Sequence, residues 1–366
     1  MKRAVIGYIM DGRSGGLDTY LLNFIETVSS QGLEIDLLTN KIDDDLNSYL
    51  RPKGVRLEEI PTLRHPAAQY RKMCALIRER KYDTAYFNIS TAIDCVGAIA
   101  ARKCGVNKIV IHSHASGNDC KNGLKKLVFD LIHKVCRGFL YRMGTEYYGA
   151  SRTAGLWMFP EKIVDSSVFH VILSAVDKEK YSFDRALREE VRREEHVEDN
   201  FVIGHVGNFC YVKNYGFILR IFREIYEKEK RARLLLVGDG ALYEEVRRDA
   251  EELGVLSYVK FTGWRSDTER LVQAMDVFLL PSFFEGMSLV SLEAQCAKLP
   301  CVLSDTVPEE TRITDVCQYV SLDKSAEEWA DIVLSAGKTN RDDCRFLPVK
   351  YAYDRREQQE ELRKIL

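Results

Sequence analysis

The sequence has 366 residues, more than one hydrophobic core usually supports, so two domains of about 150 to 200 residues each are expected. Its 53 Lys and Arg against 55 Asp and Glu leave a net charge of −2, which argues against a nucleic-acid-binding protein with a global basic field. Ten cysteines without a C-x-x-C pair exclude a zinc or disulfide framework and predict reduced thiols in a cytoplasmic chain. Because no run of about 18 apolar residues occurs, no membrane-spanning helix is expected.

The first half of the chain alternates apolar, strand-like runs with amphipathic, helical runs. At the amino terminus, MKRAVIGYIMDG predicts a first strand and not a signal peptide, because its apolar run is brief and ends at Asp11-Gly12. This strand is expected at residues 4–10. A helix at 17–31 and strands at 34–38, 84–87 and 108–112 are expected to follow it. This alternation predicts βαβ units and hence a parallel sheet.

A second alternation begins at residue 201 and predicts a second parallel sheet. Strands are expected at 201–206, 233–237, 258–261 and 277–280, with helices at 217–228 and 241–253. The charged segment 182–200 between the halves predicts a solvated helix and loop that joins two domains. We place the boundary near Val176, which gives domains at 1–176 and 177–345 and a charged helix in 346–366 that is expected to cross back to the first domain.

A glycine-rich turn follows the first strand, in DGRSGGLDTY. Gly12, Gly15 and Gly16 would let the backbone approach an anion at the start of the next helix, although such a turn also forms without a ligand. The spacing is not G-x-G-x-x-G, and Asp36 lies inside its strand and not at the strand's end. Both features argue against a nicotinamide cofactor.

Three similar turns follow strands of the second half. In GNFCYVKN, Lys213 stands at the start of a helix, where its ammonium and the free N–H groups of the helix would act on the same diphosphate. Gly238 opens a tight turn after the strand at 233–237. In the turn after the next strand, Trp264 precedes Arg265 and would either cover a base or pack against the protein.

The stretch PSFFEGMSLVSLEAQ, after the strand at 277–280, contains two glutamates eight positions apart. Glu285 lies in the loop at the carboxyl end of the strand, where open α/β sheets bind ligands. A helix is expected at 288–298, and the helical period places Glu293 on the face packed on the sheet, together with Leu289, Val290, Cys296 and Ala297. A carboxylate there needs donors, which a ligand would supply. The alternative is a loop glutamate and a helix glutamate that pairs with a nearby arginine.

The strand at 108–112 ends in HSHAS, which places His112 and His114 on the same side of the strand. Such a pair could bind a metal, but no third ligand has suitable spacing, and no metal site is predicted. A structural imidazole that caps the loop is the alternative role. Asp43 and Asp45 form a D-x-D pattern, which we interpret as a solvated turn or helix start in preference to a metal motif.

In this order the motifs resemble glycosyltransferase family 4, and the resemblance covers essentially the whole chain. The family's Gly-Gly loop, G-R-x-x-x-x-K signature, V-G-D-G turn and E-x7-E pair correspond to Gly15-Gly16, residues 207–213, residues 237–240, and Glu285 with Glu293. The E-x7-E pair is the most specific of these. The resemblance, which extends to bacterial capsular and exopolysaccharide members, implies an α/β protein of GT-B architecture. Its two Rossmann-like parallel-sheet domains would face each other across a cleft, the first for the acceptor and the second for the donor.

The resemblance also implies roles for individual residues. Lys213 would hold the donor's pyrophosphate, Glu285 would lie near the donor sugar, and Glu293 would bind the ribose hydroxyls. A histidine is expected near the sugar, and we choose His114, so that His114 and Glu285 are the predicted catalytic residues. The other predicted donor contacts are Gly15, Gly16, Asn208, Gly238, Trp264, Arg265, Gly286, Met287 and Ser288.

The implied activity is transfer of a sugar, with retention and without a metal, from a nucleotide diphosphate donor to a sugar or lipid-linked hydroxyl acceptor. UDP is the expected nucleotide, and no cofactor is expected. A GT-B nucleotide-sugar epimerase and a non-catalytic nucleotide-sugar-binding subunit remain alternatives. Asn208 replaces the family's arginine and cannot neutralise a phosphate, although Arg13 is a candidate to compensate. Of the family's N-G-[IV]-D at the domain junction, only Val176 and Asp177 match.

Residues 121–143, KNGLKKLVFDLIHKVCRGFLYRM, predict an amphipathic helix. Its apolar stripe comprises Leu124, Leu127, Val128, Leu131, Ile132, Val135, Phe139 and Met143. Its basic face comprises Lys125, Lys126, Lys134, Arg137 and Arg142, with Asp130 as the one acidic residue of the stretch. We expect the stripe to be buried on the first sheet, and the basic face to rest on an anionic membrane surface on the inner side of the cytoplasmic membrane.

Overall fold

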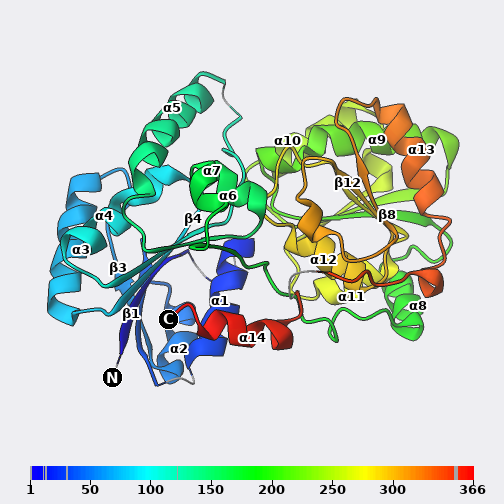
Figure 1. The fold of residues 1–366 in the computed structure, drawn as a ribbon. Coiled ribbons are helices and arrows are strands. Elements are labelled where there is room, and N and C mark those ends of the chain that lie inside the picture. The colour runs from blue at the N-terminus through cyan, green and yellow to red at the C-terminus, as the bar shows by residue number, and fades with distance from the viewer. Residues whose placement is uncertain (1, 11, 13–14, 30–31, 122, 350–352) are drawn as a thin grey trace. The chain divides into compact units, whose positions relative to one another are not determined.

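The computed structural model describes residues 2–10, 12, 15–29, 32–121, 123–349 and 353–366. The chain divides into two compact units (Figure 1). Unit 1 comprises Met1–Ala175 together with Tyr351–Leu366, and unit 2 comprises Val176–Lys350. Each unit is built on its own parallel sheet, as the two alternating series in the sequence predicted.

Unit 1 contains a seven-stranded parallel sheet with the order β3-β2-β1-β4-β5-β6-β7 among the described residues. Its strands are β1 (Arg3–Ile9), β2 (Glu34–Thr39), β3 (Val55–Glu59), β4 (Thr84–Ile89), β5 (Lys108–Ser113), β6 (Glu146–Gly149) and β7 (Phe169–Val171). Its helices are α1 (Gly16–Val28), α2 (Asp44–Leu50), α3 (Pro66–Arg80), α4 (Val96–Lys103), α5 (Gly123–Leu140), α6 (Arg152–Met158), α7 (Glu161–Val164) and α14 (Arg355–Arg363).

Both faces of the first sheet are buried, which explains why its central strands are almost continuously apolar. Successive residues of β4 alternate between the two faces. Tyr86 joins the cluster that Phe24 and Ile25 of α1 form on one face, and Phe87 joins the cluster that Met73 and Ile77 of α3 form on the other. Helices on both sides of the sheet thereby fix its register.

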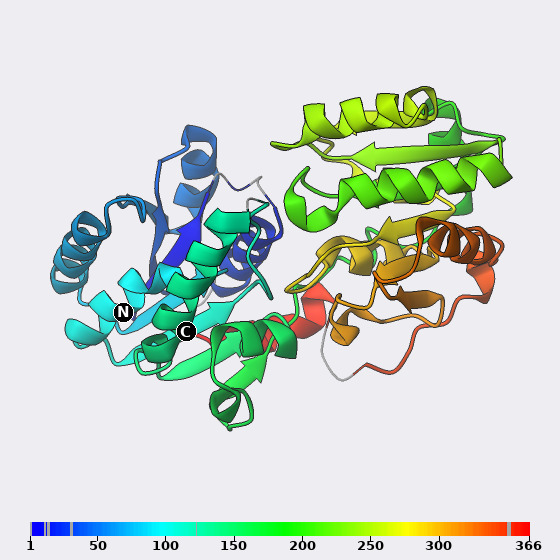
Figure 2. The same ribbon diagram turned by 90° about the horizontal axis from the view of Figure 1, so that it is seen from above.

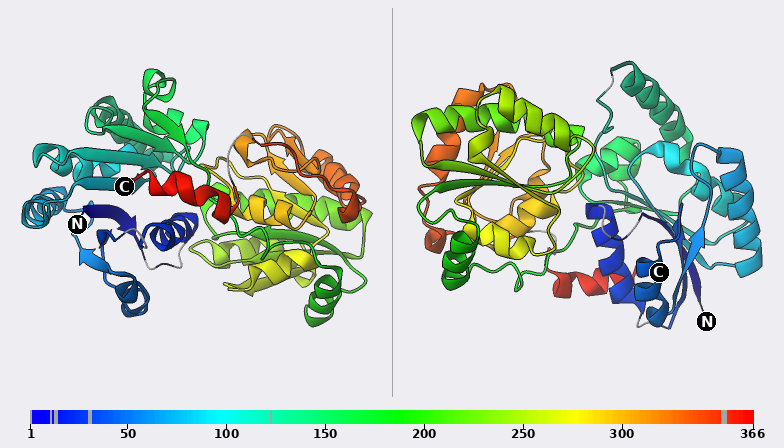
Figure 3. Two further views of the ribbon diagram at one scale, coloured as in Figure 1. Left: turned by 60° about the horizontal axis from the view of Figure 1, so that its bottom comes forward. Right: turned by 180° about the vertical axis from the view of Figure 1, so that it is seen from behind.

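The C-terminal helix α14 packs against α1 within unit 1, and Figure 3 shows the two helices side by side. Arg355 forms an ion pair of 2.8 Å with Glu26 of α1, and the Gln358 side chain donates to the Leu173 carbonyl. The end of the chain is also held, because Lys108 Nζ donates to the Lys364 carbonyl at 3.1 Å. The last segment therefore belongs to the first unit in space, although it follows the second in sequence.

Unit 2 contains a six-stranded parallel sheet with the order β10-β9-β8-β11-β12-β13 among the described residues. Its strands are β8 (Phe201–Val206), β9 (Ala232–Val237), β10 (Val259–Gly263), β11 (Val277–Leu280), β12 (Cys301–Ser304) and β13 (Cys317–Val320). Its helices are α8 (Arg185–Glu194), α9 (Tyr215–Lys228), α10 (Tyr243–Glu252), α11 (Thr268–Ala274), α12 (Leu289–Cys296) and α13 (Ala326–Ala336). Figure 2 shows helices on both faces of this sheet.

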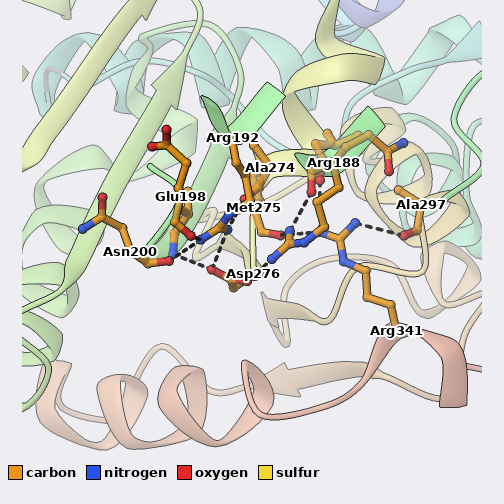
Figure 4. A network of polar contacts seen from close by, with 12 residues as sticks. Arg188, Arg192, Glu198, Asn200, Ala274, Met275, Asp276, Ala297 and Arg341 are labelled. Carbon is orange, nitrogen blue, oxygen red and sulfur yellow. Dashed lines mark hydrogen bonds and ion pairs between the residues drawn. The ribbon is translucent and has the colours of Figure 1, made fainter. Parts of the chain in front are cut away.

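The segment 182–200 was predicted to be a solvated helix and loop, and for α8 this prediction is only partly right. Two of its arginines converge on Asp276, at 2.5 Å for Arg188 and 3.2 Å for Arg192 (Figure 4). Asp276 also accepts the Val202 backbone N–H at 2.7 Å, so one carboxylate joins α8 to β8. Arg192 is 9 % exposed and donates to the Ala274 carbonyl at 2.7 Å. Arg188 and Arg192 thus anchor α8 within unit 2, whereas its other charged residues, Arg185, Glu189, Glu190, Arg193 and Glu194, are exposed.

No disulfide bond is present among the described residues, which include all ten cysteines. In the part of the chain that the structure describes, every helix is too short or too polar to cross a membrane.

Candidate active site

The order of strands in unit 2 defines where a ligand would bind. The chain adds β9 and β10 on one side of β8, and it adds β12 and β13 on the far side of β11. The direction of winding therefore reverses between β8 and β11, which are paired neighbours. In open α/β sheets, the loops at the carboxyl ends of such a pair diverge and leave a crevice for a ligand.

The two loops at this switch point are joined by an ion pair. Lys213 Nζ lies 2.7 Å from Glu285 Oε1, and the same oxygen accepts the Ser282 hydroxyl at 2.7 Å. Both side chains are largely enclosed, with 14 % of Lys213 and 9 % of Glu285 exposed. The Phe283 N–H donates to the Val212 carbonyl at 2.9 Å and holds the two loops together beside the pair. The structure therefore unites two predicted site residues, one from each loop.

Glycines let the loops after β8 and β9 approach each other closely. A Cβ at Gly238 would lie 2.1 Å from the Gly207 carbonyl oxygen, and a Cβ at Gly240 would lie 2.7 Å from the Phe209 nitrogen. Both glycines have positive φ, 138° and 154°, which other residues rarely adopt. The Gly238 N–H donates to the Gly263 carbonyl at 2.9 Å. The turn at 237–240 thus has a structural reason for its glycines, and the contact of Gly238 with a donor stays a prediction.

The predicted buried face of α12 is only partly right, because Cys296 and Ala297 are buried as predicted but three other residues are not. Leu289, Val290 and Glu293 are only partly buried, whereas the buried face of the helix carries Ser291, Leu292, Ala294, Gln295 and Cys296. Gln295 can be buried because its side-chain oxygen accepts the backbone N–H groups of residues 313 and 314 at 2.9 and 3.1 Å. Of the two glutamates, Glu285 in the loop is the more deeply buried residue, at 8 % exposure, and Glu293 is partly buried.

The Glu293 carboxyl lies in protein surroundings that disfavour its ionised form, although the side chain is partly exposed. Burial raises the pKa of Glu293 to about 7, and the nearby Tyr181 hydroxyl and Lys180 ammonium offset this only in part. Tyr181 itself is hydrogen-bonded to Thr268 at 2.8 Å. A carboxyl poised near neutrality can accept hydrogen bonds as a carboxylate or donate one as an acid.

Gly286, Met287 and Ser288 connect Glu285 to the start of α12. Ser288 is the N-cap residue, but its hydroxyl makes no capping bond to the helix. Among the described residues this buried hydroxyl has no hydrogen-bond partner. Buried hydroxyls are normally satisfied, so the unpaired Ser288 Oγ beside Glu285 suits a ligand oxygen at the helix amino terminus.

The other predicted donor contacts of unit 2 differ in their surroundings. Asn208 is exposed after β8, and Trp264 is 58 % exposed, so neither is held in the protein core. Arg265 is already compensated, because it pairs with Asp267 at 2.6 Å and with Glu195 at 3.2 Å. The Asp267 and Glu195 carboxylates also raise the pKa of Arg265.

His205 is a residue of this site that the sequence analysis missed. Its Nδ1 lies 2.9 Å from the Leu279 carbonyl, which can only accept, so Nδ1 carries the proton. The other ring nitrogen, Nε2, is buried without a partner among the described residues. A Cβ at Gly207 would lie 3.3 Å from His205 Nε2 and 3.2 Å from Lys213 Cε, so the imidazole lies beside the lysine stem. Burial lowers the pKa of His205 to about 3, and the ring is neutral. A polar residue inside FVIGHV was the available signal.

In unit 1, His112 and His114 lie side by side, as the strand period predicted, with ring centroids 4.0 Å apart. His112 is fully buried and its Nδ1 is 2.6 Å from the Tyr86 hydroxyl. His114 is partly exposed, and its Nε2 is 2.9 Å from Asn88 Oδ1. Burial lowers the pKa of His114 to about 3, so this imidazole is neutral and can donate or accept but not supply a positive charge.

The glycine-rich turn of unit 1 is closed by a carboxylate that the sequence analysis did not single out. Asp18 is fully buried in α1 and accepts the backbone N–H groups of Met10 at 3.1 Å and Gly12 at 2.9 Å. Gly15 has a φ of 100° and caps α1, and Gly16 is the first residue of this helix. Arg13, the candidate to compensate for Asn208, lies outside the described residues.

Two acidic positions have structural roles. Asp43 caps α2 by accepting the Leu46 N–H at 2.9 Å, which confirms the predicted helix start at the D-x-D pattern. Asp36 is buried in β2 and pairs with Arg80 at 2.9 Å and Arg56 at 3.3 Å, so it serves the sheet. Among the described residues, no group of three or more His, Cys, Asp or Glu side chains has the arrangement of a metal site.

Comparison with known proteins identifies both units. Residues 8–141 match the family model described as glycosyl transferase 4-like, and residues 200–337 match the model described as glycosyl transferases group 1. The chain is 27 % identical over 355 residues to the putative glycosyltransferase EpsF of Bacillus subtilis, with 94 % of this chain and 91 % of EpsF covered. It is 28 % identical over 308 residues to an Escherichia coli UDP-Gal:alpha-D-GlcNAc-diphosphoundecaprenol alpha-1,3-galactosyltransferase, with 78 % of this chain and 77 % of that protein covered.

Solved structures show the same fold. Anabaena HepE in complex with UDP-glucose has a TM-score of 0.76 at 18 % identity, with 100 % of this chain and 98 % of HepE covered. WaaG, a glycosyltransferase involved in lipopolysaccharide biosynthesis, has a TM-score of 0.70 at 17 % identity, with 99 % and 94 % covered. With a 4-like domain in unit 1, a group 1 domain in unit 2 and the GT-B fold, the chain belongs to the family 4 glycosyltransferases.

Proposed function

We propose that the protein transfers a sugar from a UDP-linked donor to a hydroxyl acceptor, with retention at the anomeric carbon and without a metal. The observation that carries the proposal is the enclosed pair of Lys213 and Glu285 at the switch point of the second sheet. A cation held at the carboxyl ends of parallel strands suits a diphosphate, and a carboxylate beside it suits sugar hydroxyls.

The choice of UDP rests on relatives. HepE has been solved with UDP and with UDP-glucose, and the Escherichia coli relative is named for UDP-Gal. A relative from Mycolicibacterium smegmatis, 26 % identical over 303 residues, is named for GDP-mannose. Both relatives cover a similar share of the chain, 78 % and 79 %. The UDP group is favoured because its relative is slightly more identical, at 28 % against 26 %, and because the HepE structure with UDP-glucose covers the whole chain.

In the proposed mechanism the departing diphosphate carries the developing charge. The Lys213 ammonium and the amino terminus of α12 would stabilise that charge, which removes the need for a divalent cation. The bond from the anomeric carbon to the phosphate oxygen breaks, and the acceptor oxygen forms its bond on the same face. The acceptor's proton passes to the departing phosphate oxygen, and Glu285 orients the sugar. The contact of His114 with the sugar stays a prediction.

The acceptor we propose is a sugar, either lipid-linked or in a growing polysaccharide. Support comes from the diphosphoundecaprenol-linked acceptor in the name of the Escherichia coli relative, and from the lipopolysaccharide role in the description of WaaG. Both are statements about those proteins, and they set the acceptors to be tried first with this chain.

A donor panel tests the proposal. UDP- and GDP-sugars are incubated with the protein, with and without undecaprenyl-diphosphate-linked sugars and with EDTA in a parallel series. We expect transfer from a UDP-sugar that requires an acceptor and persists in EDTA. Conversion of the donor without an acceptor would identify an epimerase, and binding without turnover would identify a non-catalytic subunit. Strict dependence on Mg²⁺ or Mn²⁺ would contradict the metal-free mechanism.

A further inference from the structure

The apolar stripe of α5 is exposed, contrary to the prediction that it packs on the first sheet. Six large apolar side chains of this one helix are more than two-fifths exposed, namely Leu124 (76 %), Leu127 (68 %), Val128 (51 %), Leu131 (64 %), Ile132 (41 %) and Val135 (61 %). The remaining members of the predicted stripe, Phe139 and Met143, pack partly against the core of unit 1. Figure 1 shows the first turns of α5 extending outward from unit 1. A contiguous apolar surface of this kind marks an interaction site.

The opposite face of α5 is the one that unit 1 holds. His133 is buried, stacks on Trp157 with ring centroids 3.9 Å apart and accepts the Ala92 N–H at 3.1 Å. One turn later, Arg137 donates to the carbonyls of Leu156 and Phe159 at 2.9 and 2.6 Å. These bonds fix the rotation of the helix about its axis. The stripe therefore faces outward because polar residues of the other face are satisfied by backbone groups of unit 1.

The charges of α5 are arranged around the stripe. At about 100° per residue, Leu124, Leu131 and Val135 lie opposite His133, and Lys125 and Lys134 lie along the two edges of the stripe. Asp130 is on the packed side, where Lys126 forms an ion pair with it at 2.7 Å. From Leu124 to Val135 the stripe is about 16 Å long at the helical rise. An aliphatic stripe of this length bordered by lysines is the pattern of a helix that lies in a lipid interface.

We propose that α5 docks unit 1 on an anionic phospholipid surface, with the six aliphatic side chains among the acyl chains and the edge lysines at the phosphates. Composition favours lipid over a protein partner, because protein interfaces are enriched in aromatic residues and arginine and depleted in lysine. The exposed stripe is entirely aliphatic, and both of its edges carry lysine. This docking goes beyond the proposed transfer reaction and does not depend on which donor the protein uses.

Vesicle binding of the full chain tests the proposal. The parent is sedimented with phosphatidylcholine vesicles that contain or lack phosphatidylglycerol, at low and high salt, and is compared with Leu127→Ser combined with Leu131→Ser. We expect salt-sensitive binding of the parent to the anionic vesicles. Binding should fall about tenfold or more in the variant, because two leucines that would insert among the acyl chains are lost. Both leucines are exposed, so the variant should fold, and unchanged binding of UDP measured by calorimetry checks that separately.

A matched control removes apolar surface elsewhere in unit 1. Ile42 and Val168 are each 38 % exposed and lie outside α5, so Ile42→Ser combined with Val168→Ser should bind vesicles like the parent. Lys125→Glu combined with Lys134→Glu should lose binding to anionic vesicles while it leaves UDP binding unchanged.

Three results would overturn the proposal. The first is absence of vesicle binding at low salt, and the second is equal binding to vesicles with and without phosphatidylglycerol. The third is a parent dimer in sedimentation velocity that the leucine variant abolishes, because the stripe would then contact a second copy of the chain. None of these results would affect the proposed donor chemistry, which is measured separately by UDP binding.

Discussion

Lys213 and Glu285 are 72 residues apart in the sequence, yet their charged atoms lie 2.7 Å apart. The lysine follows β8, the glutamate follows β11, and these adjacent strands lie on the two sides of the point where the sheet reverses its winding. In the structure each charge neutralises the other. A diphosphate that binds here would take over the ammonium, and Glu285 would become available to hydroxyl groups of the donor.

Lys213→Ala should weaken UDP binding by about 1.5–3 kcal/mol, the usual cost of losing a hydrogen bond to a charged group. Isothermal titration calorimetry measures the change directly. Lys230→Ala is the matched control, because Lys230 is in the same unit but is an exposed lysine paired with Glu227. Equal affinity of Lys213→Ala and the parent would remove the main support for a nucleotide site between these loops.

Glu285→Gln separates the two roles of the pair. The amide keeps the shape and the Ser282 contact but removes the negative charge that competes for Lys213, so UDP should bind at least as tightly as in the parent. Transfer should slow because the sugar loses a charged acceptor for its hydroxyls. A variant with weaker UDP binding and unchanged turnover would reverse this assignment.

Asn208→Arg should tighten the binding of UDP more than that of UMP. Asn208 is exposed at the end of β8, where an arginine would add a positive charge near the phosphates without displacing buried groups. The added charge acts mainly on the second phosphate, which UMP lacks. Asn208→Gln, which lengthens the side chain without adding charge, should leave the ratio of the two affinities unchanged. If Asn208→Arg strengthens both ligands equally, position 208 does not contact the diphosphate.

Asp276→Asn should destabilise unit 2 by at most about 3–5 kcal/mol, the cost of breaking a fully buried ion pair, because 18 % of the Asp276 side chain is exposed. Asp276 is the shared partner of Arg188 and Arg192, and it also binds the Val202 N–H (Figure 4). Urea denaturation followed by tryptophan fluorescence measures the loss. Asp331→Asn, which removes an exposed carboxylate paired with Lys228, should change the free energy of unfolding by no more than about 1 kcal/mol.

Apolar patterning predicted the strands well but not the orientation of the helices. The strands at 201–206 and 277–280 lie at the predicted residues because both are buried on two sides, which makes every position apolar. For α5 and α12 the helical period of the apolar residues was visible, but the predicted buried face was wrong for α5 and only partly right for α12. His133 and Gln295 are buried because backbone N–H groups of Ala92 and of residues 313 and 314 reach them. Those donors are distant in sequence, so the periodicity of one helix cannot reveal them.

The candidate site was predicted in part for a related reason. Lys213 and Glu285 stand in loops after apolar strands, and parallel strands bring such loops to one edge of the sheet. His205 was missed because it lies inside a strand, where the polar side chain is tolerated through its bond to the Leu279 carbonyl. Asp18 was missed because its partners are backbone N–H groups of the preceding turn, at Met10 and Gly12. Backbone partners leave no pattern in the sequence.

The pH dependence of Glu293 provides the last test. Burial raises its pKa from 4.5 to about 7. The folded protein therefore keeps a proton that the unfolded chain releases above pH 4.5, so this group's contribution to stability is fully present below that pH and is lost as the pH rises through about 7. Glu293→Gln cannot ionise, and its free energy of unfolding should lack this decline. Glu244→Gln, a change at an exposed helix position, should retain it.

Ribose hydroxyls that donate to Glu293 favour the carboxylate, so UDP binding should release a proton between pH 6 and 7, close to the pKa of about 7. Calorimetry in buffers of different ionisation enthalpy counts that proton, and UDP affinity should rise as the pH increases through this range. In Glu293→Gln the released proton and the pH dependence should both decrease, and what remains is the titration of UDP's own terminal phosphate, whose pKa is about 6. Proton release in Glu293→Gln equal to that in the parent would show that Glu293 does not titrate on binding, and the assignment of Glu293 to the ribose would then be wrong.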